Sequence, residues 1–185
     1  MGIEKDMEIA KERAKKVKAF VHDIHGVLTP NVLYCDQEGR RQYSFWHMDG
    51  FGDLSLFAND IKVFYLDTTS IDEEGLYRAK ELKLDKFYYK VTDKVAKLEE
   101  LEKQLNLTDE EIGCLGSEIT DLRLMKKVGF AVATNDAVDE VKDAAHYITN
   151  APGGRGAMRE TCEFILRARD GWDAWVEKVT KMGYK

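Results

Sequence analysis

Short apolar segments alternate along this chain with helical patterns about ten residues long, and this alternation limits the possible folds more than any other feature. The strand-like segments occupy residues 18–23, 62–66, 86–89, 112–115, 129–133 and 147–148. Between two of them, Leu98, Leu101 and Leu105 recur at spacings of three and four, which is typical of one helix face. Another helix is predicted over residues 51–59, ahead of the strand at 62–66. Helices between successive strands imply crossover connections and a parallel sheet covered on both faces. The sequence therefore predicts an α/β fold, with a Rossmann-like parallel sheet between two layers of helices.

Three further segments complete the predicted organisation. Residues 3–16 carry the spacing of an amphipathic helix, and residues 32–46 read as a β-hairpin around a turn at 36–39. We expect a single domain over residues 1–170, with the hairpin inserted after the first strand. Residues 171–185 are predicted to form a tail or helix that packs on this domain or on a neighbouring copy.

Composition and charge narrow the classes of partner. With 28 Lys and Arg against 34 Asp and Glu, the chain has a net charge of −6, which disfavours a nucleic-acid partner. The longest stretch without a charged residue, Ile24 to Cys35, has 12 residues and is too short to cross a membrane. The first residues lack the apolar core of a secretion signal, and the three cysteines share no metal-binding spacing. We expect a cytoplasmic protein.

Chemically active side chains follow four of the predicted strands. These residues are Asp23 and His25, then Asp67, Thr68 and Thr69, then Lys94, and finally Ser117, Glu118 and Asp121. Because the carboxyl ends of parallel strands share one edge of the sheet, these side chains are predicted to converge there.

The segment Asp23-Ile24-His25-Gly26-Val27-Leu28-Thr29 resembles the first motif of haloacid-dehalogenase-type phosphatases, DxDGVLT. The hairpin, the segment 49–52 and the glycine-rich segment 153–157 resemble a small tetrameric subgroup that includes 3-deoxy-manno-octulosonate 8-phosphate phosphatase. The resemblance implies a Rossmann-like fold of this type without a large cap domain. It also implies a homotetramer assembled through the hairpin, for which the apolar Trp46 is well suited.

The resemblance assigns roles to some residues and shows departures at others. It implies that Asp23 is the nucleophile and Lys94 the phosphate-binding lysine. His25 stands where the family has an acid/base aspartate, and Asp67-Thr68-Thr69 replaces Thr-Gly-Arg. Ser117 replaces the principal magnesium carboxylate, which leaves Asp23, Glu118 and Asp121 as ligands for a weak Mg²⁺ site or none.

The replaced residues leave alternatives open. A carboxylate at Asp67, about 4 Å from a phosphate charge, costs on the order of 4 kcal/mol at an effective dielectric of 20. Alternatively, Asp67 turns away and Thr68 or Thr69 supplies a hydroxyl. His25 is either an acid/base group or a loop histidine on which nothing depends. Arg155, at a helix start, either holds an anion or is merely exposed.

A further hypothesis concerns a different metal. Together, Asp23, His25, Asp67 and Glu118 form a mixed nitrogen and oxygen set that suits a transition metal better than magnesium.

Three functions follow from these departures. The first is a catalytically degenerate relative that binds a small anionic or sugar ligand or a partner, or has a structural role. The second is a hydrolase with altered chemistry that uses Asp23, His25 and Lys94. The third is a magnesium-dependent phosphatase of a 3-deoxy-ulosonic acid phosphate.

Overall fold

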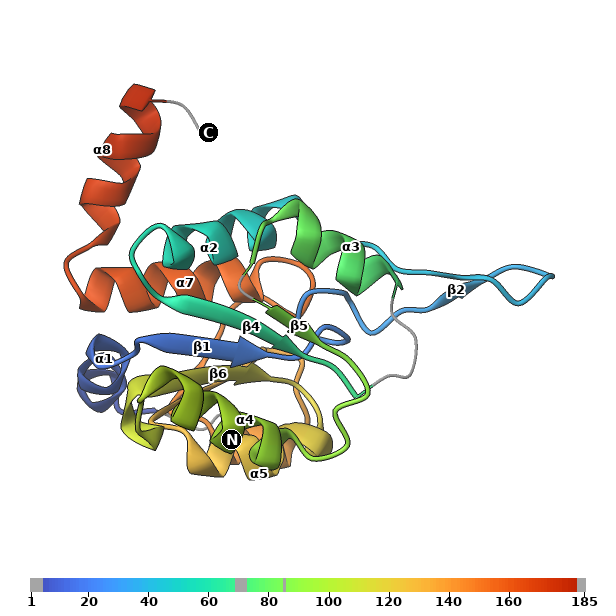
Figure 1. Cartoon of the computed structure of the whole chain (residues 1–185), viewed down its shortest axis with the longest axis horizontal. Helices are drawn as coiled ribbons and strands as arrows, with labels where there is room; N and C mark the ends of the chain where they lie inside the picture. The colour runs from blue at the N-terminus through green and yellow to red at the C-terminus, as the bar shows by residue number, and fades with distance from the viewer. Residues whose placement is uncertain (1–4, 69–72, 85, 183–185) are drawn as a thin grey trace.

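The computed structural model describes residues 5–68, 73–84 and 86–182, and its centre is a parallel sheet in the order β5-β4-β1-β6-β7-β8 (Figure 1). The strands of this sheet are β1 (Ala19–His22), β4 (Lys62–Leu66), β5 (Lys86–Tyr88), β6 (Ile112–Gly116), β7 (Phe130–Ala133) and β8 (Tyr147–Ile148). The α-helices are α1 (Met7–Lys15), α2 (His47–Phe57), α3 (Glu73–Glu81), α4 (Lys94–Leu105), α5 (Leu122–Lys127), α6 (Asp139–Ala144), α7 (Ala157–Ala168) and α8 (Trp172–Met182). The predicted α/β fold is confirmed.

Helices cover both faces of the sheet, because successive side chains of each strand point to opposite sides. On β1, Phe20 belongs to a core shared with α1, α2 and α7, whereas Val21 belongs to a second core shared with α4, α5 and α6. Figure 1 shows α2 and α7 on one side of the sheet and α4 and α5 on the other. The chain builds β4 and β5 on one side of β1 and then crosses to β6 on its other side. The carboxyl end of β1 is therefore the switch point where ligands of such sheets bind.

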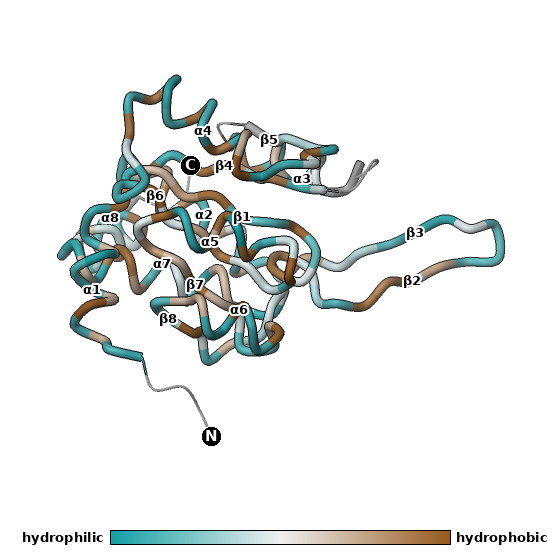
Figure 2. The backbone as a smooth tube through the Cα atoms, turned by 90° about the horizontal axis from the view of Figure 1, so that it is seen from below, coloured by the Kyte–Doolittle hydropathy of each residue, from teal (hydrophilic) through white to brown (hydrophobic). Residues whose placement is uncertain are grey.

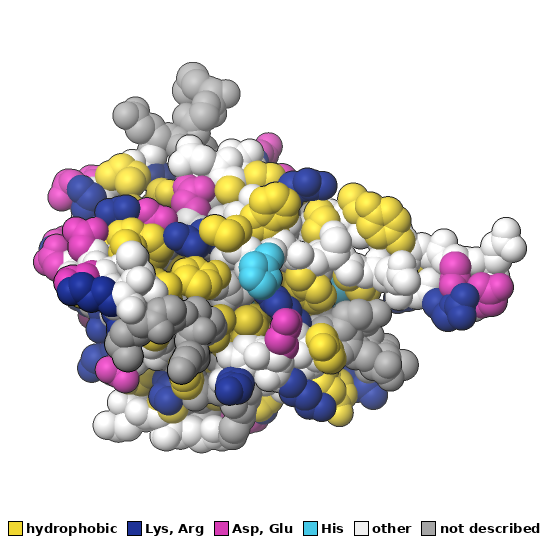
Figure 3. Space-filling view, turned by 90° about the horizontal axis from the view of Figure 1, so that it is seen from above, with side chains coloured by type: hydrophobic (Ala, Val, Ile, Leu, Met, Phe, Trp, Pro, Cys, Tyr) yellow, Lys and Arg dark blue, Asp and Glu magenta, His cyan; other side chains and the backbone are white. Residues whose placement is uncertain are grey.

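The inserted hairpin is present, although its strands β2 (Tyr34–Cys35) and β3 (Arg41–Gln42) are shorter than the sequence predicts. It projects away from the body of the molecule, with hydrophobic residues along its first limb (Figure 2). Charged side chains lie at its tip (Figure 3), where Arg40 pairs with Asp36 and Glu38. The hairpin therefore presents an apolar base and a solvated tip.

Two helix boundaries differ from the sequence-based expectation. The first helix begins at Met7, where the Asp6 side chain accepts hydrogen bonds from the amides of Glu8 and Ile9. Helix α2 begins at His47 rather than near Phe51.

Helix α8 lies in the predicted tail and buries its two tryptophans against the core. No helix in the described ranges has the length and apolar character that a membrane span requires.

Candidate active site

The end of β1 places a buried carboxylate beside a buried ammonium. Asp23 directly follows β1 and is 8% exposed, and Lys94 is the first residue of α4 and is 5% exposed. Helix α4 begins here because the Asp93 side chain accepts hydrogen bonds from two amides of its first turn. The Lys94 Nζ atom lies 2.5 Å from Asp23 Oδ2 and 2.7 Å from Asp121 Oδ1. The structure thus brings together three of the residues that the sequence selects.

Asp121 also fixes the loop after β6. Its Oδ2 atom accepts hydrogen bonds from the amides of Ser117, at 2.9 Å, and Glu118, at 3.2 Å. Both oxygens of Asp121 therefore have partners within the protein, one in this loop and one on Lys94. Asp121 orients the lysine and the loop rather than presenting a free carboxylate.

The Asp23 carboxylate is held on both oxygens. Its Oδ1 atom accepts a hydrogen bond from the Ile24 amide at 2.8 Å, while Oδ2 accepts one from Lys94. Burial raises the pKa of Asp23 to about 6, although Lys94 acts in the opposite direction. Burial by itself lowers the pKa of Lys94, but Asp23 and Asp121 outweigh it and raise the value above the ordinary one. At neutral pH Asp23 and Lys94 are therefore mainly ionised.

Asp67 adds a further buried acidic residue at the same edge of the sheet. It follows β4, the neighbour of β1, and is 1% exposed. Its amide donates to the Tyr88 carbonyl, and its carbonyl accepts from the Val91 amide, so its main chain is fixed. Thr68 is exposed, and Thr69 lies outside the described residues.

Lys94 is one of the residues that line a groove of about 210 Å³. The other lining residues are Thr68, Thr92, Asp93, Val95, Ile119, Thr120, Arg123 and Leu124. Three threonine hydroxyls and the ion pair of Arg123 with Asp93, at 3.3 Å, give this groove a polar lining suited to a small hydroxylated ligand. Thr92, Thr120 and Arg123 were not predicted from the sequence, because none of them stands at a defined position of the motifs that the chain resembles.

His25 and Glu118 are less buried than Asp23, Lys94 and Asp121. His25 is half-buried, and its ring centre is 4.3 Å from that of Tyr43 on the hairpin. Glu118 is exposed, and its Oε1 atom accepts a hydrogen bond from the Ile119 amide. Among the described residues no group of three or more His, Cys, Asp or Glu is placed to hold a metal ion. The structure therefore does not assemble the transition-metal set that includes Asp23, His25, Asp67 and Glu118.

A magnesium ion, which the family implies, finds a limited donor set here. The Ser117 hydroxyl is buried and has no hydrogen-bond partner within the described part of the chain. It lies beside the loop after β1, at 2.5 Å from the point where a side chain on Gly26 would begin. This hydroxyl and the Asp23 carboxylate are oxygen ligands of the kind that Mg²⁺ takes, with water to complete the shell. They fit a weak site, because only one of the two carries charge.

The glycine-rich segment supports the loop that follows Asp23. A side chain on Gly153 would begin 1.8 Å from the Gly26 carbonyl oxygen, and Gly154 has a φ of +62° and donates to the Val27 carbonyl. Glycine is required at both positions because the two backbones touch. Arg155 is exposed beside this contact.

The start of α7 is not an open anion site. The Asp49 carboxylate accepts hydrogen bonds from the amides of Gly156, at 3.1 Å, and Arg159, at 2.9 Å. The chain's own Asp49 carboxylate thus takes the place that was predicted for an anionic ligand at Arg155. Burial raises the pKa of Asp49 to about 6.

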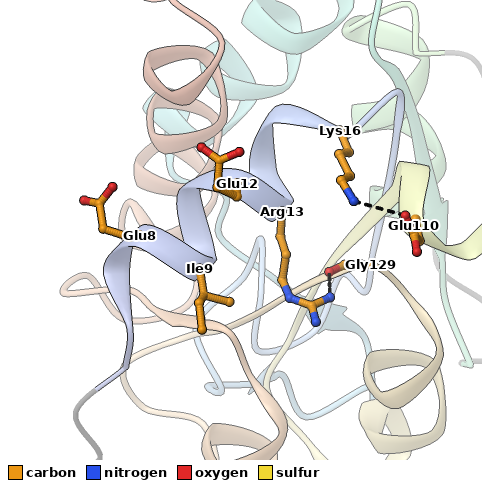
Figure 4. Close-up of a pocket in the computed structure, with 7 residues that line it drawn as sticks. All are labelled: Glu8, Ile9, Glu12, Arg13, Lys16, Glu110 and Gly129. Atoms are coloured by element: carbon orange, nitrogen blue, oxygen red, sulfur yellow. Dashed lines mark hydrogen bonds and ion pairs between the residues drawn. The ribbon is translucent and has the colours of Figure 1, made fainter.

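A second groove, of about 400 Å³, lies along α1 and is separate from these residues (Figure 4). Its charged side chains are engaged within the protein, because Arg13 donates to the Gly129 carbonyl and Lys16 pairs with Glu110. Gly129 and Glu110 precede β7 and β6, so this groove lies at the opposite edge of the sheet from Asp23.

Comparison with known proteins identifies the family of this chain. Residues 61–156 match the family of haloacid dehalogenase-like hydrolases. The chain is 32% identical over 161 residues to the 3-deoxy-D-manno-octulosonate 8-phosphate phosphatase of Yersinia pestis, covering 86% of this chain and 84% of that protein.

Two solved structures of such phosphatases contain metal ions. The enzyme of Moraxella catarrhalis, in complex with magnesium, phosphate and a KDO molecule, superposes with a TM-score of 0.90 at 28% identity, covering 94% of this chain and 99% of that one. The cobalt-bound enzyme of Haemophilus influenzae gives a TM-score of 0.82 at 29% identity, covering 88% and 94%. On the family match and the extent of these similarities, the chain belongs to the haloacid dehalogenase-like hydrolase family.

Proposed function

We propose that the chain is a phosphohydrolase that cleaves a phosphate monoester of a sugar acid, with Asp23 as its nucleophile. The observation that supports this most strongly is the buried Asp23–Lys94 pair at the switch point of the sheet. There the carboxylate is fixed on both oxygens and the ammonium offsets its charge. A carboxylate approaches a phosphate only where cations offset the repulsion between them.

The substrate class rests on the relatives and on the groove beside Lys94. The named relatives act on 3-deoxy-D-manno-octulosonate 8-phosphate, a phosphorylated sugar acid. The hydroxyls of Thr68, Thr92 and Thr120 suit hydrogen bonds with sugar hydroxyls. Arg123 pairs with Asp93 at 3.3 Å through one nitrogen, and its other N–H groups suit a carboxylate. In the relatives' subgroup motif an arginine stands where this chain has Thr69, so Arg123 supplies a cation from another element.

The reaction takes place in two steps. A carboxylate oxygen of Asp23 attacks phosphorus, the bond from phosphorus to the sugar oxygen breaks, and His25 donates a proton to the leaving oxygen. His25 then accepts a proton from water, whose oxygen attacks phosphorus and releases Asp23 and inorganic phosphate. Mg²⁺ held by Asp23 and Ser117 would supply positive charge against the phosphate dianion.

A non-catalytic relative that binds an anionic ligand or a partner is the second candidate. Two observations favour it: Asp67 adds a buried acidic residue at this edge, and Ser117 has no charge with which to hold a metal. The similarity to phosphatases over most of the chain favours hydrolysis instead.

We also propose that the chain self-associates as a tetramer through the hairpin. The apolar side chains exposed at the hairpin and its base are Val32, Leu33, Tyr34, Trp46 and Met48. Burial of such a contiguous apolar surface favours association.

A cytoplasmic location remains a prediction from the sequence, as does the division between a domain over 1–170 and a tail.

Phosphate release from 3-deoxy-D-manno-octulosonate 8-phosphate and from a panel of other sugar phosphates, with and without Mg²⁺, tests the proposed function. We expect turnover that Asp23→Asn abolishes and that Asp173→Asn, the same change at an exposed side chain, leaves intact. Absence of turnover, followed by its appearance in a triple variant with His25→Asp, Asp67→Thr and Ser117→Asp, would support the non-catalytic candidate.

A further inference from the structure

Three buried polar side chains lie in a row that leads to Asp23 from the side of the sheet that α2 covers. His22 is the last residue of β1, Asp53 is on α2, and Tyr65 is on β4. All three side chains are completely buried. Polar groups in such surroundings are costly unless they are hydrogen-bonded, so their contacts restrict how each of them can be oriented.

The contacts fix the orientation of the His22 ring. Its Nδ1 atom lies 2.8 Å from the main-chain oxygen of Asp23. Because a carbonyl oxygen can only accept, Nδ1 carries hydrogen and donates. On the other side, Nε2 lies 3.3 Å from Asp53 Oδ1, and the Tyr65 hydroxyl donates to Asp53 Oδ2 at 2.7 Å. Both Nε2 and Oδ1 are without a hydrogen-bond partner in the described ranges, so their approach is a contact and not a hydrogen bond. A ring flip would leave Oδ1 facing carbon instead.

The peptide unit between Asp23 and Ile24 transmits this orientation to the carboxylate. Its carbonyl accepts from His22, and its N–H donates to Asp23 Oδ1 at 2.8 Å. The peptide unit is planar, so a rotation of the carbonyl rotates the N–H by the same angle. His22 therefore sets the direction of the hydrogen bond that holds one carboxylate oxygen, while Lys94 holds the other.

We propose that His22 is a positioning residue for Asp23, acting through the Asp23–Ile24 peptide, and that Asp53 and Tyr65 hold its ring in place. This inference deepens the proposed function, because it rests on Asp23 as the nucleophile. A role in packing alone would need no donor, and an apolar ring would fill the same space without the cost of burying two nitrogens.

Two substitutions at His22 separate donation from packing. His22→Asn keeps an N–H close to the position of Nδ1, whereas His22→Phe keeps a ring and removes the donor. His47→Phe, at an exposed histidine at the start of α2, is the matched control. Hydrogen exchange of the Ile24 amide, measured by NMR relative to the Leu115 amide on β6, reports the peptide orientation without any need for activity.

In His22→Phe we expect the Ile24 amide to exchange roughly ten-fold faster relative to Leu115, as for loss of one hydrogen bond. His22→Asn and His47→Phe should stay within about two-fold of the wild type. In phosphate release, His22→Phe should lower kcat by about ten-fold to a hundred-fold with KM unchanged, and His22→Asn should restore most of it.

Unchanged Ile24 exchange in His22→Phe, or equal effects of both substitutions, overturns the positioning role. If the wild type releases no phosphate while the exchange pattern is as expected, the proposed function fails and the positioning of Asp23 stands. Should His22→Phe fail to fold, Tyr65→Phe tests the buried polar group that lies farthest from Asp23 in this set. It should speed exchange at Ile24 by roughly two-fold to three-fold relative to Leu115, and no change there overturns the proposal.

Discussion

Replacing Asp23 by Asn should change how the stability of the protein depends on pH. Burial raises the pKa of Asp23 from 3.8 to about 6, so the folded state binds this proton more tightly than the unfolded state. The wild type therefore loses stability as pH rises from about 4 through 6, whereas Asn at this position cannot ionise. The difference of about two pKa units corresponds to about 3 kcal/mol.

Of this amount, about 2 kcal/mol should develop between pH 4.5 and pH 8, in favour of Asp23→Asn. Urea unfolding of both proteins at the two pH values, without divalent metal, measures it. Asp49, whose pKa is also raised, is present in both proteins, so its effect cancels in the difference. In the control Asp173→Asn, at an exposed side chain, the free energy of unfolding relative to the wild type should change by less than about 0.5 kcal/mol between the two pH values. A difference between wild type and Asp23→Asn that is the same at both pH values would refute the burial argument.

Three further outcomes are expected. Ser117→Asp should bind Mg²⁺ at least about ten-fold more tightly than the wild type in calorimetry, because a second carboxylate joins Asp23, and equal affinity would place the metal elsewhere. Trp46→Glu should give a smaller species in light scattering at equal concentration, because it places a charge in the apolar base of the hairpin, and an unchanged mass would exclude that surface from assembly. Trp175→Ala should lower the free energy of unfolding by about 3 kcal/mol in urea titration, since its ring packs 5.9 Å from Phe51, and a loss below 1 kcal/mol would show that α8 is not docked.

The sequence predicted the layers of the fold because each strand is a short apolar run and each helix repeats apolar residues every three or four positions. It misplaced the start of α2, where Gly50 and Gly52 interrupt that pattern. In the structure a side chain on Gly52 would meet the backbone of Arg159, so close packing against α7 favours glycine there, whereas one on Gly50 would meet the guanidinium end of Arg78. The helix is thus set by tertiary contacts that periodicity does not show.

The residues of the candidate site could likewise be predicted only in part. Asp23 and Lys94 could be placed together because each follows a strand that ends at the same edge of the sheet. The roles of Asp49 and Asp53 could not be predicted from the sequence, because both residues lie on a helix face and their partners come from α7, β1 and β4. A pattern of residues along the chain indicates which edge of a sheet a side chain reaches, but not which distant donor it meets.

The central claim is that Asp23 forms a covalent bond to phosphorus, and chemical trapping tests it most directly. The wild type is acid-quenched during turnover of 3-deoxy-D-manno-octulosonate 8-phosphate with Mg²⁺, reduced with borohydride, digested and analysed by mass spectrometry. Borohydride converts an aspartyl phosphate to homoserine, so we predict homoserine at position 23 and unmodified aspartate at Asp121. Phosphate release without homoserine at position 23 would contradict the role of Asp23 as nucleophile.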